Sequence, residues 1–379
     1  MNKIVVLGAG TGGTIVTNKL WKKLKKSKKP FEITIVDKTF KHIYQPGFLF
    51  TMFNRDKTNN IVGDGTKLVP KGVNKVKAGV KKVDTKKKVI HLDNDQTLEY
   101  DYLVLATGAR LAPERVDWWD DSIHHFYSPE GAEKLYNALE NFTGGKILIA
   151  IGDLPYRCPP APLEAAFLLD DWFKKKGMRD KVDLKFCSPL NRAFSIETVN
   201  TVVQPLFAKK NIELETYFNV EDVDTEEKVI YSLEGSDDDY DLLILVPPHA
   251  AQKYIVESGI AEGAGWVPTD KSTLEVKGQE NMWALGDTTD IPTSKAGSTA
   301  HYEAPIVAQN IYNKIVENGK VEKYDGHVQC FFLTQFGRSL FIDFNYEHPP
   351  KPGRPNIFMW WFKQIFKPFY FKLVAKGLV

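Results

Sequence analysis

Cysteine is scarce in this sequence, and no stretch of its C-terminal tail is apolar enough to cross a membrane. The 379 residues include three cysteines, and their spacing matches no zinc-binding pattern. A disulfide scaffold and a structural metal site are therefore excluded as the basis of the fold, and we expect no metal. Any disulfide in so cysteine-poor a chain is expected to be a working one rather than a structural one.

A signal peptide and a nucleic-acid site are also not expected. An apolar strand begins at residue 3, which leaves no room for a charged region followed by a hydrophobic one. The formal net charge of +2 is unevenly spread, because residues 351–379 contain six basic residues and no acidic one. The rest of the chain is slightly acidic and has no basic stretch with interleaved aromatics, so we predict that nucleic acid is not a partner.

The first forty residues carry the strongest motif. Lys3–Leu7 (KIVVL) reads as an apolar strand that meets Gly8, Gly10 and Gly13, and a second apolar strand ends at Asp37. This order of strand, glycines, helix and acid is typical of a dinucleotide-binding site, because glycine lets the backbone approach a pyrophosphate at the helix N-terminus. The acid is placed to bind a ribose hydroxyl. An ordinary tight turn is the alternative that the complete pattern disfavours.

Two later strands end in small-residue turns. Tyr102–Gly108 (YLVLATG) and Asn281–Asp287 (NMWALGD) each read as a buried strand followed by such a turn. Before the first of them, Val76–Val83, Val89–Leu92 and Thr97–Tyr100 are expected to form three antiparallel strands. The turn residues that we assign to a cofactor site are Thr107, Gly108, Gly286 and Asp287.

A second parallel unit is predicted from the apolar strands Gly145–Gly152, Val182–Cys187 and Asp241–Val246. Its first turn reads GDLPYRCPP, from Gly152 to Pro160, in place of spaced glycines. The aspartate, tyrosine and prolines remove N–H donors, add bulk and bring negative charge to the place where a pyrophosphate would lie. We therefore predict that the second nucleotide site has been lost.

Cys158 stands in that altered turn, at the start of a helix predicted over about residues 161–176. A helix dipole favours a thiolate at this position, which suits a redox-active thiol. Cys330 lies much later, in His327–Phe332 (HVQCFF). Cys187 belongs to an apolar strand and is expected to be a core thiol.

With these motifs the chain resembles, over nearly its whole length, the sulfide:quinone oxidoreductase and flavocytochrome c sulfide dehydrogenase family. These proteins are FAD-dependent pyridine nucleotide-disulfide oxidoreductases, and the fingerprint, the ATG turn and the late Gly-Asp turn are where such flavoproteins contact FAD. The resemblance implies an FAD site formed by Gly8, Gly10, Gly13, Asp37, Thr107, Gly108, Gly286, Asp287 and Lys295.

The resemblance also implies a sulfur relay. Cys158 and Cys330 are expected to meet over one face of the flavin, with Cys330 as the flavin-facing sulfur. Hydrosulfide would attack a disulfide or polysulfide bridge between them, and the electrons would pass to FAD. Glu164 matches a family glutamate that could relay protons, the alternative being a solvent-facing helix carboxylate. Lys295 is expected beside the flavin, where its charge would stabilise the reduced form, the alternative being an exposed loop lysine.

The sequence departs from its relatives in two places. Some sulfide:quinone oxidoreductases have a third essential cysteine after the ATG turn, but residues 109–157 contain none. Flavocytochrome subunits bind FAD covalently through a cysteine that is missing from residues 40–50 here. We therefore expect non-covalent FAD, and a three-cysteine relay is in doubt.

The aromatic and basic tail is predicted to bind a membrane surface without crossing it. Its longest uncharged run has eight residues, far fewer than the roughly 20 that span a bilayer. Pro368 is expected to divide it into two short helices, whose aromatic and lysine side chains lie among lipid headgroups. Docking on the core or on a dimer partner is the alternative. The predicted lipid contacts are Trp360, Trp361, Phe362, Lys363, Phe366, Lys367, Phe369, Phe371 and Lys372.

These features predict an α/β protein with two Rossmann-like dinucleotide-binding domains and C-terminal amphipathic membrane-binding helices. The FAD-binding domain is expected at 1–110 and 251–325, the second domain at 111–250, and a redox-cysteine and membrane-binding region at 326–379. The expected reaction is oxidation of hydrogen sulfide with transfer of electrons to membrane quinone, and a homo-oligomer is considered. The predicted quinone contacts are Phe331, Phe332 and Phe358.

Three alternatives remain open from the sequence. The first is a type II NADH:quinone dehydrogenase. The altered second glycine turn and the paired cysteines disfavour it. The second is a flavocytochrome c type flavoprotein, whose exported subunits hand electrons to a haem protein. The third is a flavin-bearing membrane scaffold or redox sensor, which would need neither cysteine near the flavin.

Overall fold

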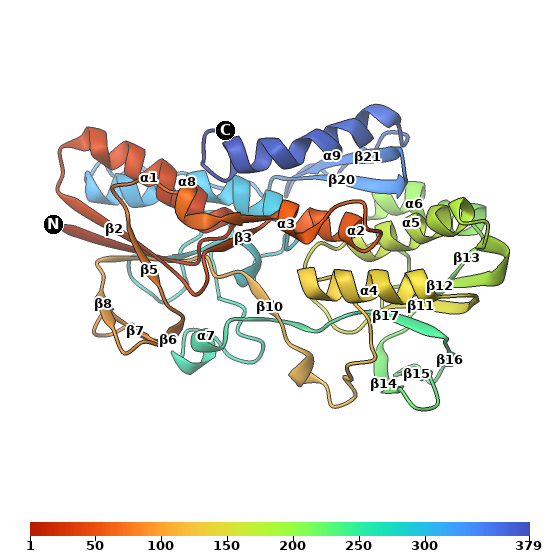
Figure 1. Cartoon of the computed structure of the whole chain (residues 1–379). Coiled ribbons are helices and arrows are strands. Elements are labelled where there is room, and N and C mark those ends of the chain that lie inside the picture. The colour runs from red at the N-terminus through yellow and green to blue at the C-terminus, as the bar shows by residue number, and fades with distance from the viewer.

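The computed structural model describes all 379 residues, and its first sheet is built around the glycine fingerprint. The sheet is parallel and consists, in spatial order, of β19 (Met282–Ala284), β9 (Tyr102–Leu105), β1 (Asn2–Leu7), β2 (Phe31–Asp37) and β5 (Asn74–Lys77). Helices α1 (Thr11–Ser27) and α8 (Gly297–Ile315) lie side by side above it (Figure 1). The sheet is therefore completed only after the chain returns from the second sheet.

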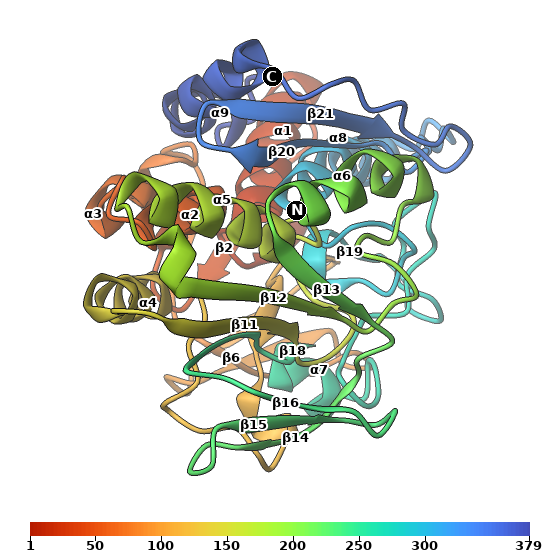
Figure 2. The ribbon, with the colours of Figure 1, turned by 90° about the vertical axis from the view of Figure 1, so that its right-hand side faces the viewer.

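The second sheet is also parallel, as predicted from its apolar strands. It consists of β13 (Ile212–Thr216), β12 (Val182–Ser188), β11 (Gly145–Ile151) and β17 (Leu242–Val246). All residues of β17 are buried, as expected for a parallel strand that is covered on both faces. Helices α5 (Ala161–Lys175) and α6 (Glu197–Lys209) lie on one side of the sheet (Figure 2), and α4 (Pro129–Asn141) precedes it in the chain.

Each sheet carries a three-stranded antiparallel meander. The first contains β6 (Val80–Asp84), β7 (Val89–Leu92) and β8 (Thr97–Glu99). The prediction that a meander strand begins at Val76 is wrong, because that residue belongs to β5 and pairs with β2. The second meander contains β14 (Val220–Asp224), β15 (Val229–Ser232) and β16 (Asp237–Asp239).

The two meanders reveal an internal repeat in the sequence. Residues 84–105 (DTKKKVIHLDNDQTLEYDYLVL) and 224–245 (DTEEKVIYSLEGSDDDYDLLIL) have the same length and pattern, and each leads from a meander into a buried parallel strand. The repeat shows that the two sheets are built from the same structural unit.

A hairpin and a long helix complete the chain. Strands β20 (Val328–Gln335) and β21 (Arg338–Phe344) pair with each other and lie between α5 on one side and α9 (Ile357–Phe369) on the other (Figure 2). Pro368 does not divide the tail as predicted, because it lies in the last turn of α9 and a π-helical turn, Tyr370–Val374, follows directly. No helix in the structure combines the length and the apolar composition that crossing a membrane requires.

The remaining elements are short. The antiparallel pair β10 (Ala109–Leu111) and β18 (His249–Ala251) forms where the chain passes between the two sheets. The others are β3 (Lys41–Ile43), β4 (Val62–Asp64), α2 (Phe48–Thr51), α3 (Thr58–Ile61), α7 (Lys253–Glu257), and the 3-10 turns Gln45–Gly47, Gly65–Lys67, Pro113–Arg115, Arg179–Lys181 and Gly286–Thr288.

Candidate functional site

The three fingerprint glycines meet three different spatial requirements. Gly8 has φ +100°, and a Cβ there would lie 2.4 Å from the carbonyl oxygen of Ala106. At Gly13 a Cβ would lie 1.9 Å from the carbonyl oxygen of Gly8, so the helix packs directly on the turn. A Cβ at Gly10 would meet nothing within 4 Å. Gly8 and Gly13 therefore make the turn tight, and Gly10 leaves open space where a ligand can approach.

The first turn of α1 is free to bind an anion. Gly10 caps the helix without a side-chain hydrogen bond, so no protein side chain occupies the N-terminal N–H groups. Asp37 lies beside this turn, where its Oδ2 accepts a hydrogen bond from Ala9 N at 2.9 Å. Its Oδ1 accepts from Phe40 N at 2.7 Å. The geometry of the turn suits the pyrophosphate of FAD, which is the cofactor that the family implies.

The two other predicted cofactor turns end neighbouring strands, β9 and β19, of the same sheet. Gly108 has φ +63° and open space at its Cβ position. Gly286 has φ +73°, and its N–H donates to the buried Glu303 carboxylate. The other oxygen of Glu303 has no partner, and burial raises the pKa of this carboxyl to about 8. Glu303 of α8 thus fixes the backbone of the turn at Gly286, directly before Asp287.

Lys295 is buried, so the alternative of an exposed loop lysine is wrong. Its side chain is 9% exposed, and its Nζ donates to the carbonyl oxygens of Asp287 (3.0 Å) and Thr289 (2.7 Å). Burial lowers the pKa of Lys295 to about 8, although the Asp287 carboxylate opposes the shift. Its carbonyl oxygen accepts a hydrogen bond of 2.7 Å from Cys158 N. The loop therefore links Cys158 to the late Gly-Asp turn.

Cys158 occupies a strained turn immediately before α5. Its φ is +53°, which is uncommon for a residue with a side chain. Its N–H is bound by Lys295, and its carbonyl oxygen accepts from Ala161 N at 2.9 Å. The prediction of a low thiol pKa is wrong, because burial and then the nearby Cys330 raise the pKa of Cys158 well above its ordinary value. Desolvation outweighs the helix terminus here.

Cys330 is the third residue of β20 and lies close to Cys158. Both cysteines are partly buried free thiols, and each is in contact with the same hydrophobic core. Burial and the negative charge of Glu164 raise the pKa of Cys330 to about 12. Cys187 is fully buried in a separate core cluster and behaves as the core thiol that the sequence predicts.

Glu164 links the two elements that carry these cysteines. It is 1% exposed on α5, so the alternative of a solvent-facing carboxylate is wrong. Its Oε1 accepts hydrogen bonds from Leu333 N on β20 at 2.7 Å and from Lys363 Nζ on α9 at 2.6 Å. The prediction that Lys363 lies among lipid headgroups is also wrong, because its side chain is 7% exposed and also donates to Phe331 O at 2.9 Å.

We expect replacement of Lys363 by methionine to destabilise the protein by about 3–5 kcal/mol, because it leaves the Glu164 carboxylate buried without its cation. Urea unfolding measures the change. Lys367→Met is the matched control, since the ion pair of Lys367 with Asp56 is 29% exposed at the lysine and is worth at most about 1 kcal/mol. Equal, small losses in both variants would contradict the assignment of a tightly coupled buried pair.

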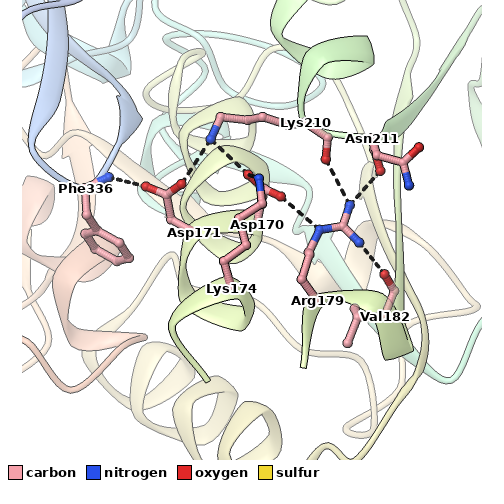
Figure 3. A network of polar contacts seen from close by, with 8 residues as sticks. All are labelled: Asp170, Asp171, Lys174, Arg179, Val182, Lys210, Asn211 and Phe336. Atoms are coloured by element: carbon pink, nitrogen blue, oxygen red, sulfur yellow. Dashed lines mark hydrogen bonds and ion pairs between the residues drawn. The ribbon is translucent and has the colours of Figure 1, made fainter. Parts of the chain in front are cut away.

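A second polar network fixes the far end of α5 (Figure 3). Asp171 accepts a hydrogen bond from Phe336 N at 2.7 Å, at the tip of the β20–β21 hairpin. The fully buried Asp170 accepts from Arg179 Nε at 2.9 Å and from Lys210 Nζ at 3.0 Å. Glu164 and Asp171 are two helical turns apart, and each binds a backbone N–H of the hairpin. They hold Cys330 in a fixed position relative to α5.

The predicted quinone contacts Phe331 and Phe332 face opposite sides of the hairpin. The ring of Phe331 lies on the α9 side of the hairpin, 6.5 Å from that of Phe366. Phe332 is fully buried on the opposite side, against Phe167 and Phe194, so its prediction as a quinone contact is wrong. Adjacent residues of a strand face opposite sides of the sheet. Phe358 is 71% exposed at the start of α9.

Helix α9 turns its apolar side outward. Its exposed large side chains, 37–71% accessible, are Ile357, Phe358, Trp361, Phe362, Ile365, Phe366 and Phe369. Two other predicted lipid contacts are partly buried against the core, since the ring of Trp360 contacts Phe50 and that of Phe371 lies against Gly63. Lys367 is bound to Asp56, and Lys372 is exposed. An amphipathic helix that packs on a core usually buries its apolar side, whereas α9 exposes large apolar side chains and buries Lys363.

Three polar residues near Cys158 were not predicted from the sequence, namely Arg157, Tyr127 and His249. Arg157 donates to Tyr127 O at 2.9 Å, and the ring of Tyr127 lies 5.3 Å from that of His249. Arg157 Nε, Tyr127 OH and His249 Nε2 are all buried without a partner, so a polar ligand could satisfy them. The position of Arg157 directly before Cys158 was the available signal. No cluster of three or more acidic, His or Cys side chains is placed to bind a metal.

Comparison with known proteins finds relatives over nearly the whole chain. Residues 2–117 match the model of the pyridine nucleotide-disulphide oxidoreductase family. It is 25% identical to mitochondrial sulfide:quinone oxidoreductase of Mus musculus, over 99% of this chain and 86% of that protein. The Dictyostelium discoideum enzyme of the same name is 29% identical over 91% of this chain and 78% of that protein.

The fold agrees as well. The X-ray structure of sulfide:quinone oxidoreductase from Aquifex aeolicus superposes with a TM-score of 0.87 at 20% identity, covering 100% of this chain and 92% of that one. The chain is thus similar over nearly its whole length to proteins named sulfide:quinone oxidoreductase, which is the resemblance that its motifs predicted.

Proposed function

We propose that this protein is an FAD-dependent sulfide:quinone oxidoreductase in which Cys158 and Cys330 are the sulfur relay. The observation that carries the proposal is their convergence: Cys158 is tied to the loop of Lys295, and Cys330 is tied through Leu333 to the helix that begins beside Cys158. The full-length relatives named sulfide:quinone oxidoreductase support it. Hydrogen sulfide is the proposed donor and membrane quinone the proposed acceptor.

The chain's own residues would perform the sulfur chemistry. Hydrosulfide attacks a disulfide between the two cysteines, the S–S bond breaks, and one cysteine becomes a persulfide while the other leaves as a thiolate. FAD, when bound, would accept the two electrons released when the persulfide and the thiolate join into a trisulfide bridge. A second hydrosulfide would then remove the added sulfur as hydrodisulfide and restore the disulfide. The Arg157 guanidinium beside Cys158 attracts the hydrosulfide anion, and the second oxygen of Glu164, free of other bonds, is available to exchange protons with the thiols.

Lys295 is proposed to hold a positive charge beside the flavin. Because its pKa is lowered to about 8, the charge is present below that pH and is lost as the pH rises through it. We expect sulfide-dependent reduction of the flavin to slow about tenfold per pH unit above pH 8. Lys295→Arg keeps its positive charge at higher pH, so its activity should extend to higher pH. The ionisation of sulfide is the same in both assays, so comparison of the two proteins controls for it. Stopped-flow measurement of flavin bleaching tests this.

Unfolding does not explain such a loss. Between about pH 8 and the ordinary lysine pKa, the unfolded chain binds more protons at this residue than the native protein, so its contribution to stability increases with pH. Identical pH profiles for the wild type and Lys295→Arg would contradict the role assigned to Lys295.

The exposed side of α9 is proposed to be the membrane-binding surface. It presents large apolar and aromatic side chains, and the residues from 351 onward contain no acid that acidic lipid would repel. Phe331, on the side of the hairpin that faces α9, and Phe358 at its start are proposed to contact quinone entering from the membrane. The proposed domains are 1–110 with 251–325 for FAD, 111–250 for the second unit, and 326–379 for the tail.

Titration of the FAD-loaded protein tests the function. We expect stoichiometric sulfide to bleach the flavin and decylubiquinone to restore its colour, whereas NADH should leave the flavin oxidised. The turn from Gly152 to Pro160 supports the second expectation, since Cys158 and the prolines occupy it. Bleaching by NADH but not by sulfide would favour a type II NADH:quinone dehydrogenase instead.

A further inference from the structure

The end of the chain returns to the cofactor fingerprint. Tyr370 directly follows the last residue of α9, and its hydroxyl lies 2.6 Å from Thr11 Oγ1 and 2.7 Å from His42 Nε2. Thr11 is the first residue of α1, beside the open position of Gly10. Tyr370 and His42 are 6% and 1% exposed. A residue of the proposed membrane segment thus makes buried hydrogen bonds to the turn that would hold the FAD pyrophosphate.

The direction of these hydrogen bonds is fixed by one carbonyl group. His42 Nδ1 lies 2.8 Å from Ala9 O, and a carbonyl only accepts, so Nδ1 carries the proton. Burial lowers the pKa of His42, so the imidazole is neutral at neutral pH and Nε2 is an acceptor. The Tyr370 hydroxyl therefore donates to His42 and accepts from Thr11. The chain of bonds fixes residues on both sides of Gly10.

Neighbouring contacts fix the segment after α9 against the FAD fingerprint region. The ring of Phe371 lies against Gly63, where a Cβ would come within 2.7 Å of it. Gly377 lies on α1, where a Cβ would be 3.3 Å from the carbonyl oxygen of Ile15. The outward apolar residues of α9 end at Phe369, immediately before Tyr370. The surface proposed to bind lipid is therefore followed directly in the chain by the residues that contact the fingerprint turn and α1.

We propose that Tyr370 and His42 are positioning residues for FAD, and that residues 370–377 form a strap whose hold on the phosphate-binding turn is strengthened when α9 lies on a lipid surface. The inference rests on the proposed FAD site and membrane surface. A rigid turn retains the pyrophosphate because its N–H groups stay aimed at the phosphate oxygens. Because coupling is reciprocal, lipid that stabilises the docked tail must also stabilise bound FAD.

The test is the rate at which the full-length holoprotein releases FAD, followed by flavin fluorescence after dilution. Tyr370→Phe removes the hydroxyl and keeps the ring, and we expect release to become about tenfold faster, the effect of one buried hydrogen bond. Tyr324→Phe is the matched control, since that buried hydroxyl binds His327 O at 2.8 Å, away from the fingerprint, and its release rate should be unchanged. Thr11→Val removes the bond from the other side and should accelerate release similarly.

Phosphatidylcholine vesicles that contain phosphatidylglycerol test the coupling. They should slow FAD release from the wild type and from Tyr324→Phe, and should have no such effect on Tyr370→Phe, although that variant still sediments with the vesicles. Wild-type release rates in both Tyr370→Phe and Thr11→Val would overturn the positioning role. Release that vesicles leave unchanged in the wild type would overturn the coupling. Sulfide-dependent quinone reduction at saturating FAD is a separate readout, and its absence would count against the proposed function alone.

Discussion

Replacement of Cys158 or Cys330 by serine is expected to reduce sulfide-dependent quinone reduction on the order of 10³-fold or more. Each substitution removes one sulfur of the proposed bridge, and residues that act as a unit lose nearly all activity when either is absent. The structure supports treating them as a unit, because α5 and β20 are tied together through Glu164 and Asp171. Steady-state assays with sulfide and decylubiquinone measure the effect.

Cys187→Ala is the matched control for these two variants. Cys187 is buried in β12, in a core cluster separate from the one that Cys158 and Cys330 contact. The variant should lose some stability but keep its activity. FAD content should stay normal in all three proteins, because none of the cysteines lies in the three cofactor turns. Activity that survives in Cys158→Ser or Cys330→Ser would contradict the relay and favour a flavoprotein with another function.

A double replacement on α9, Trp361→Glu with Phe362→Glu, is expected to weaken binding to vesicles at least about 100-fold. Each aromatic side chain contributes about 1.5–3 kcal/mol when it is removed from water, and each new carboxylate is repelled by acidic lipid. Reduction of quinone dissolved in the vesicles should fall with the binding. Bleaching of the flavin by sulfide should be unchanged, because neither side chain contacts the cysteines. Vesicle co-sedimentation and stopped-flow absorbance measure the two effects.

The matched control is Tyr217→Glu with Leu233→Glu, which replaces two side chains of similar exposure, 58% and 66%, in the second unit. It should bind vesicles as the wild type does. Equal loss in both double variants would show that the response is to net charge and not to α9. If the α9 variant instead separates a stable dimer and leaves vesicle binding intact, the exposed surface is an interface between two copies of the chain.

The FAD fingerprint could be predicted because each of its requirements is local. Gly8, Gly10 and Gly13 are needed within one turn of backbone, and a side chain at Gly8 or Gly13 would collide with the carbonyl oxygen of Ala106 or Gly8. Most strands of the two parallel sheets were equally clear from their apolar runs, but β5 and β13 were not, because neither contains an uninterrupted apolar run. The repeat between 84–105 and 224–245 was visible in the sequence but unused. Alignment of the two repeats predicts the second meander, and it shows that the first meander begins after Val76.

The tail and the thiols could not be predicted in the same way, because their properties depend on distant residues. The spacing of the lysines in α9 indicates a helix but not which side faces the core. Lys363 points inward only because Glu164, 199 residues earlier, is buried opposite it. The pKa of Cys158 likewise depends on burial by residues from other elements. Phe332 is different, since the alternation of a strand already indicated that it and Phe331 face opposite sides.

The most direct test of the account is to identify what joins Cys158 and Cys330 after turnover. The oxidised protein is treated with one equivalent of sulfide, alkylated, and digested without reductant for mass spectrometry. We expect a peptide pair in which the two cysteines are joined directly or through additional sulfur, together with persulfide on one of them. Alkylation of both cysteines as ordinary thiols in protein whose flavin has been bleached by sulfide would contradict it.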